Sequence, residues 1–221
     1  MKGSDILKHV DHTLLSPTAT WQEIEELCEE SLIYHTASIC IPPSYVARVH
    51  ETFGPTVTIC TVIGFPLGAD TTEAKVWAAK QALKNGASEI DAVVNLSDVK
   101  NGEFSKITEE ISALKKAVGK HILKIIIETC YLEDDEKIAL CRAVTDGGAD
   151  YIKTSTGFGS SGASHADVTL MRSHVGPDVK VKAAGGIRTI SDMKQYLAEG
   201  CDRLGCSAAV RLLKDKTDED I

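Results

Sequence analysis

The sequence has no long apolar run, no basic cluster and few aromatic residues, and each of these absences excludes a class of protein. No apolar stretch approaches the ~20 residues that a membrane-spanning helix needs. Charges at Lys2, Asp5, Lys8 and Asp11 interrupt the first fifteen positions, unlike a signal peptide. With 24 basic against 32 acidic side chains the net charge is -8, which offers no surface to nucleic acid or an anionic membrane. We expect a cytoplasmic protein that binds neither.

Several reactive-site patterns are also missing. The seven cysteines are an odd number without close pairing, which is typical of reduced thiols. His9 and His12 have no third ligand in their pattern, so we expect no metal. No Gly-x-Ser-x-Gly elbow indicates a serine hydrolase. Residues 157–162 match G-x-G-x-x-G, but Asp178 precedes the next predicted strand instead of ending it. We therefore expect no nicotinamide cofactor and interpret the segment as a mobile loop over a barrel mouth.

What the sequence does have is an alternation of apolar, β-branched runs with helical segments. Strands are predicted at residues 9–15, 37–41, 57–65, 89–95, 123–129, 151–156, 179–184 and 203–207. Helices are predicted at residues 104–118, 134–146, 165–174 and 190–199. Capping boxes at Thr20 with Glu23, and at Asp70 with Glu73, predict two further helix starts, and the second helix should run to Leu83.

Eight strand–helix units predict an α/β fold, a single (β/α)₈ TIM barrel with a short N-terminal extension, forming one domain over residues 1–221. Strand count alone leaves a doubly wound open sheet as the alternative. Polar residues near the ends of apolar strands favour the barrel, because chemistry gathers at the carboxyl ends of barrel strands and buried charge is costly. These residues are Asp11, Cys40, Asp91, Asn95, Glu128, Lys153 and Lys182.

Lys153 and Lys182 lie on consecutive predicted strands, which are ~5 Å apart in a sheet. An ammonium beside another ammonium is disfavoured, and a neutral lysine amine can attack a carbonyl. Asp91 is placed to shuttle protons. The plainer alternative is that one lysine only pairs with a carboxylate or binds phosphate. Lys124 and Lys180 are nearer the strand starts, and we expect both to be solvated at the bottom of the barrel.

Glycines after the last two strands indicate a phosphate site. Gly185 and Gly186 follow the seventh strand and Gly205 lies in the eighth, where barrels often bind phosphate through backbone N–H groups. Ser207 would add a hydroxyl and Arg188 a charge. The alternative is that these glycines only form tight turns.

Three further residues are candidates at the predicted site. Asp11 could orient a lysine or a substrate hydroxyl, or only neutralise a lysine, and we group it with Thr156 among the substrate-binding residues. Cys40 is a candidate at the barrel mouth, although a buried cysteine is more often a small apolar residue.

At this point the motifs resemble one family, deoxyribose-phosphate aldolase, over nearly the whole chain. The motifs are DHTLL (11–15), SICIPP (38–41 with Pro42 and Pro43), TVIGFPLG (61–68), EID (89–91) with Asn95, KIIIET (124–129), KTSTG (153–157) and KAAGGIR (182–188). The resemblance implies that Lys153 forms the Schiff base, that Lys182 perturbs it and that Asp91 is the acid/base. It also implies reversible cleavage of 2-deoxy-D-ribose 5-phosphate to D-glyceraldehyde 3-phosphate and acetaldehyde, without a cofactor.

The chain departs from the family pattern in two places. After Asn95 it continues Leu96-Ser97-Asp98-Val99-Lys100, where many relatives have Ile-Gly-Ala-Leu-Lys, so the shape of this loop is open. The chain also ends without the terminal tyrosine that assists proton transfer in some relatives. We therefore expect proton transfer to rely on Asp91, Lys182 and water.

Three other functions stay open at this point. A different Schiff-base aldolase of phosphorylated sugars would use another donor. A metal-free phosphosugar isomerase would use Asp91 as base and Lys182 as electrophile, without a covalent imine. A sugar-phosphate binding protein would turn nothing over. The oligomeric state is not set by the sequence, and a homodimer is one candidate.

Overall fold

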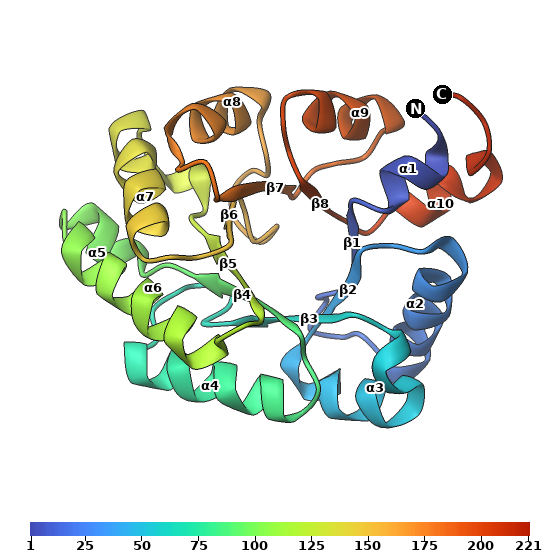
Figure 1. Cartoon of the computed structure of the whole chain (residues 1–221), viewed down its shortest axis with the longest axis horizontal. Helices are drawn as coiled ribbons and strands as arrows, with labels where there is room; N and C mark the ends of the chain where they lie inside the picture. The colour runs from blue at the N-terminus through green and yellow to red at the C-terminus, as the bar shows by residue number, and fades with distance from the viewer.

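The computed structural model describes residues 1–221 as a closed barrel of eight parallel strands surrounded by helices (Figure 1). Each strand pairs with the next, and β1 pairs with β8. The strands are β1 (Val10–Thr13), β2 (Ser38–Ile41), β3 (Ile59–Ile63), β4 (Glu89–Val93), β5 (Ile122–Ile126), β6 (Tyr151–Lys153), β7 (Lys180–Ala184) and β8 (Arg203–Cys206). The predicted (β/α)₈ barrel is confirmed, and closure through β1 and β8 excludes the open sheet.

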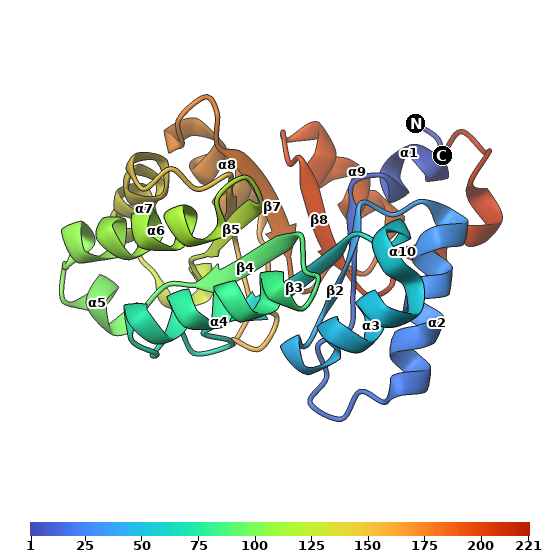
Figure 2. The ribbon, with the colours of Figure 1, turned by 60° about the horizontal axis from the view of Figure 1, so that its bottom comes forward.

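The helices form the outer ring, which Figure 2 shows from a second direction. They are α1 (Gly3–Leu7), α2 (Trp21–Tyr34), α3 (Val46–Phe53), α4 (Thr72–Lys84), α5 (Leu96–Lys100), α6 (Phe104–Val118), α7 (Asp134–Asp146), α8 (His165–His174), α9 (Ile190–Ala198) and α10 (Ala209–Leu213). The predictions for α6, α7 and α8 match residue for residue, whereas α1, α3, α5 and α10 were not predicted. None of the helices has the length and apolarity to span a bilayer.

The two predicted capping boxes have different outcomes. Thr20 caps α2, accepting the N–H of Glu23, and the Glu23 carboxylate accepts the Thr20 N–H. The prediction of Asp70 as the cap of α4 is wrong, because Thr71 has the extended backbone of a cap and accepts the N–H of Ala74. The two patterns are offset by one residue, and the backbone conformation selects the threonine.

The segment after Asn95, whose shape the sequence left open, is helical. The Asn95 side chain accepts the N–H of Ser97 and so caps the short helix α5. This arrangement closes the connection between β4 and α6 with a turn of helix.

The barrel strands separate two kinds of interior. The larger apolar core contains 48 buried residues and covers the outward face of the strands, where Ile39, Ile90 and Leu204 lie. Between these positions lie Asp91 on β4, Lys124 on β5 and other polar side chains that point the opposite way. Because alternate strand residues face opposite sides, the outer layer supplies the apolar packing while the barrel interior carries charge.

The chain ends lie together at the edge of the barrel (Figure 1). Lys2 pairs with Asp220, and the Ile221 N–H donates to the Met1 carbonyl. The Lys194 ammonium donates to the Ile221 carbonyl. The terminal residues are therefore held against α1 and α9.

Candidate active site

Seven ionisable side chains with 9 % exposure or less meet inside the barrel. This charge cluster consists of Asp11, Glu89, Asp91, Lys124, Lys153, Lys182 and Arg203. It contains four cations and three anions from six strands. Buried charges are tolerated when they are paired and hydrogen-bonded, and every member of the cluster has at least one partner of opposite sign.

Asp91 is the centre of the cluster, because both of its carboxylate oxygens are fully engaged. Its Oδ2 accepts hydrogen bonds from Lys153 Nζ and Lys182 Nζ, each at 2.8 Å. Its Oδ1 accepts from Lys124 Nζ at 2.9 Å and from Cys60 Sγ at 3.1 Å. The two lysines predicted from the sequence therefore share a single oxygen of the predicted acid/base residue.

Asp11 holds the far side of Lys182. Its Oδ2 accepts from Lys182 Nζ, and its Oδ1 accepts from Arg203 Nη1 at 2.5 Å and from Ser38 Oγ at 2.7 Å. Asp11 is fully buried and contacts a lysine, which was one of the arrangements expected from the sequence.

The expectation that Lys124 is solvated at the barrel bottom is wrong. Its Nζ lies 2.5 Å from Glu89 Oε2 and 3.5 Å from Asp11 Oδ2, and the residue is fully buried. The reason is register, because Lys124 pairs with Asp91 across β4 and β5 and so lies level with the centre of the cluster. Lys180, the other lysine of that prediction, is exposed as expected.

Mutual attraction sets the protonation of the deepest members. Burial alone would raise the pKa of Asp91, but the charges of Lys124, Lys153 and Lys182 outweigh it and hold that pKa well below the ordinary value. Burial opposes the charge of Lys182, yet Asp11 and Asp91 raise the pKa of Lys182 above its ordinary value. Asp91 is thus a carboxylate and Lys182 an ammonium near neutral pH.

A pocket of about 310 Å³ opens over the cluster at the carboxyl ends of the strands. Lys153 is the only member of the charge cluster that lines it. Among the predicted site residues, Thr156, Gly185, Gly186, Gly205 and Ser207 also line this pocket.

The remaining predicted residues lie elsewhere. Asp11, Asp91, Lys182 and Cys40 are buried and do not line the pocket. Arg188 is exposed and is not among the lining residues, although the preceding Ile187 is.

The glycines of the pocket have steric reasons to be glycine. Gly185 and Gly186 both have left-handed backbones, with φ of 81° and 75°, which L side chains rarely adopt. At Gly205 a Cβ would lie 2.9 Å from Ala184 Cβ and 3.2 Å from Lys182 Cε. Gly205 therefore leaves room for the Lys182 side chain.

The sequence did not predict that Glu128 holds Thr156 in the pocket. Glu128 is buried, has a left-handed backbone with φ of 53°, and accepts the Thr156 N–H at 3.1 Å and the Thr156 hydroxyl. Strained backbone of this kind persists where the surroundings enforce it and often marks functional sites. Its place at a strand end was readable from the sequence, but its partner Thr156, which follows β6, was not.

An aromatic pair and a thiol pair lie beside the cluster and the pocket. Phe158, which lines the pocket, meets Phe65 edge to face with ring centroids 5.4 Å apart.

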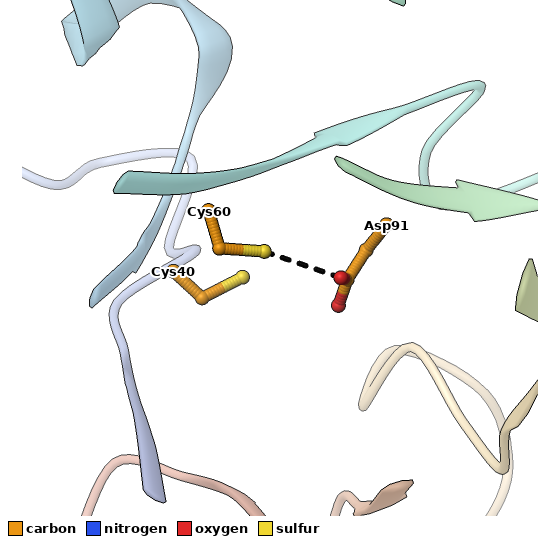
Figure 3. Close-up of side chains that lie close together, drawn as sticks. All are labelled: Cys40, Cys60 and Asp91. Carbon is orange, nitrogen blue, oxygen red and sulfur yellow. Dashed lines mark hydrogen bonds between the residues drawn. The ribbon is translucent and has the colours of Figure 1, made fainter. Parts of the chain in front are cut away.

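Deeper in the barrel, Cys40 and Cys60 face Asp91 from β2 and β3 (Figure 3). Burial raises the pKa of the Cys60 thiol well above its ordinary value, as do Cys40 and Asp91. The thiol therefore keeps the proton that it donates to Asp91.

Comparisons with known proteins place the chain among similar aldolases. Residues 6–207 match the model of the DeoC/LacD family of aldolases. A deoxyribose-phosphate aldolase of Clostridium botulinum (strain Alaska E43 / Type E3) is 61 % identical over 214 residues, covering 97 % of each chain. One of Clostridioides difficile (strain 630) is 53 % identical over 97 % of this chain and 98 % of the relative.

The solved structures include a similar barrel. The deoxyribose phosphate aldolase of Aeropyrum pernix, described as tetrameric, superposes with a TM-score of 0.87 at 31 % identity, covering 96 % of this chain and 91 % of that one. The family match, the full-length relatives and the shared barrel lead to one conclusion. The chain belongs to the DeoC/LacD family of aldolases.

Proposed function

We propose that this chain is a deoxyribose-phosphate aldolase that cleaves 2-deoxy-D-ribose 5-phosphate reversibly through a Schiff base on Lys153. The observation that carries the proposal is the position of Lys153. It is the one member of the charge cluster that lines the pocket, and it is bonded to Asp91, which also binds Lys182. The names of the relatives, which cover nearly the whole chain, support the same substrate.

The position of Lys153 relative to the other cations supports its role as the nucleophile. The cluster holds four cations and three anions. Lys124, Lys182 and Arg203 lie deeper, where Asp11, Glu89 and Asp91 pair with them. Lys153 lines the pocket, where its amine can meet the carbonyl of a substrate.

In the cleavage direction the Lys153 nitrogen attacks the aldehyde carbon of the open-chain sugar. Loss of water gives a protonated imine. A base then removes the proton of the C3 hydroxyl, this oxygen becomes a carbonyl as the C2–C3 bond breaks, and the imine accepts the electron pair of that bond and becomes an enamine. Glyceraldehyde 3-phosphate leaves, the enamine takes up a proton, and water releases acetaldehyde. Asp91 bridges Lys153 and Lys182 at 2.8 Å, so these groups and water carry the protons. The imine is the electron sink of this route.

We assign the substrate phosphate to the glycine-lined end of the pocket. Gly185, Gly186 and Gly205 line this end, and Ser207, an exposed residue, lines it as well. Backbone N–H groups after the seventh and eighth strands bind phosphate in many barrels. Thr156, which lines the same pocket and is held by Glu128, is placed with the substrate-binding residues.

The test is direct measurement of both products from 2-deoxy-D-ribose 5-phosphate. We expect equal amounts of glyceraldehyde 3-phosphate and acetaldehyde from the wild type, and neither from Lys153→Leu that is folded by circular dichroism. Conversion of the sugar phosphate to an isomer without cleavage would instead establish a phosphosugar isomerase.

A Schiff-base aldolase with another donor is the second candidate, because the matched family model covers aldolases of more than one name. Incubation of glyceraldehyde 3-phosphate with acetaldehyde or with dihydroxyacetone separates the two. We expect condensation with acetaldehyde. Condensation with dihydroxyacetone alone would assign the second candidate.

A further inference from the structure

Two thiols and the central carboxylate of the charge cluster form a group that the proposed reaction does not use as such. Cys40 on β2 and Cys60 on β3 are register partners on adjacent strands and are fully buried. Their sulfurs and an oxygen of Asp91 all lie within 4.8 Å of one another (Figure 3). Both thiols are free.

We propose that Cys40, Cys60 and Asp91 form a binding site for a thiophilic divalent cation such as Zn²⁺, which inhibits the enzyme. Thiolates select such ions, and tetrahedral zinc sites with three protein ligands keep a fourth position for water. Zn–S bonds of about 2.3 Å place two sulfurs about 3.8 Å apart in a tetrahedral site. This separation is inside the 4.8 Å that encloses the three ligand atoms here.

The charge balance of the barrel interior permits this exchange. One Zn²⁺ replaces the protons of two thiols, so two S–H bonds break, two Zn–S bonds form and two protons leave. The exchange leaves the net charge of Cys40, Cys60 and Asp91, taken together with the ion, unchanged. Lys124, Lys153 and Lys182 therefore face a group of the same net charge as in the metal-free chain.

Lys124 adds an outer contact to the proposed site. Its Nζ lies 3.3 Å from Cys60 Sγ and 2.9 Å from Asp91 Oδ1. In the metal-bound form it would donate to a coordinated thiolate, and such outer hydrogen bonds orient and stabilise metal ligands.

A second grouping, of Asp11, Cys60 and Glu89, is also compact but fits a thiophilic ion less well. It offers one thiol instead of two. The Cys40 side chain separates the two sites experimentally, because it belongs only to the first.

Inhibition follows from the position of Asp91, and this part rests on the proposed function. A metal ion on Asp91 would take electron density from the carboxylate that receives the protons of Lys153 and Lys182. Lys153 connects the pocket to the proposed metal site, since it lines the pocket and its Nζ lies 2.8 Å from Asp91 Oδ2.

The experiment titrates the full chain with Co²⁺, in the presence of a phosphine reductant and without substrate. We expect thiolate-to-cobalt charge-transfer absorption that saturates at one ion per chain, displacement of Co²⁺ by Zn²⁺, and release of two protons per ion. The absorption should be lost in Cys40→Ser and in Cys60→Ser. It should persist in Cys141→Ser, a matched control because Cys141 is buried in the outer core.

Three results would overturn the proposal. They are absence of charge-transfer absorption in the wild type, absorption that survives in Cys40→Ser, and proton release below two per ion. The wild-type result stands even if a variant does not fold. These readouts need no turnover, so they are separate from the fate of the proposed reaction. In the same samples Zn²⁺ should abolish cleavage of 2-deoxy-D-ribose 5-phosphate, and a chelator should restore it.

Discussion

Replacing Lys124 by methionine removes the cation that faces three carboxylates inside the barrel. Its Nζ lies 2.5 Å from Glu89 Oε2, 2.9 Å from Asp91 Oδ1 and 3.5 Å from Asp11 Oδ2. The lysine and both aspartates are fully buried. Methionine keeps much of the length of the side chain but leaves these carboxylates short of a partner.

The expected cost is that of breaking a buried ion pair from one side, roughly 3–5 kcal/mol in the free energy of unfolding. For a chain of this size each kcal/mol lowers Tm by about 2–4 °C, so the transition should move down by about 10 °C. Thermal unfolding followed by circular dichroism measures the shift. The double variant Lys124→Met/Glu89→Gln should lose less than the two single variants together, because the removed groups are partners.

Lys180→Met is the matched control, because Lys180 is also a strand lysine but is exposed at the start of β7. Its Nζ lies 5.6 Å from the centroid of the Tyr151 ring and has no carboxylate partner. We expect its Tm to stay close to that of the wild type, as for most surface substitutions. Equal Tm values for Lys124→Met and Lys180→Met would refute the account of the charge cluster.

Three further predictions concern Glu128, the stability in acid and the C-terminus. Glu128→Gln places an amide NH₂ where the carboxylate accepts hydrogen bonds from Thr156. The KM for 2-deoxy-D-ribose 5-phosphate should therefore rise about tenfold in steady-state kinetics, with a smaller change in kcat. An unchanged KM would contradict this. Because the folded pKa of Asp91 is depressed, its stabilising charge is fully present above the ordinary aspartate pKa of about 3.9 and is lost as the pH falls further. The stability gap between wild type and Asp91→Asn in urea titrations should therefore be constant from about pH 5 to 7 and shrink at lower pH; a gap that widens on acidification would contradict the sign. Deleting residues 216–221 should leave turnover nearly unchanged, because Ile221 binds the N-terminus and not the pocket; a large loss of kcat would assign the tail a role.

The barrel was predictable because each strand repeats the same local signal. Runs such as Ile125–Ile127 are apolar without strict alternation, as expected for parallel strands covered on both faces, and glycine or a cap marks the neighbouring helices. Short elements such as α5 and α10 were missed because five residues give too little periodicity to detect. The cap of α4 was displaced by one residue because Asp70 with Glu73 matches a capping box in the sequence, whereas Thr71, the actual cap, is followed by Ala74 at the corresponding position.

The site was predictable in part for a related reason. Lys153, Asp91 and Lys182 stand out as charges within apolar strands, and the structure brings them together. Lys124 has the same appearance, but its depth depends on the register of β5 against β4, which no local pattern contains. Arg203 illustrates the same limit, since its partner Asp11 is 192 residues away in the chain and becomes a neighbour only when β8 closes on β1.

The central claim is a covalent imine on Lys153, and reductive trapping tests it most directly. The protein is incubated with acetaldehyde and borohydride, and the peptides are analysed by mass spectrometry. We predict one N-ethyl group on Lys153, absent from Lys153→Leu and unaffected in Lys180→Met. An N-ethyl group on Lys182 instead would reverse the two lysine roles. No specific adduct on a folded chain would contradict the Schiff-base mechanism.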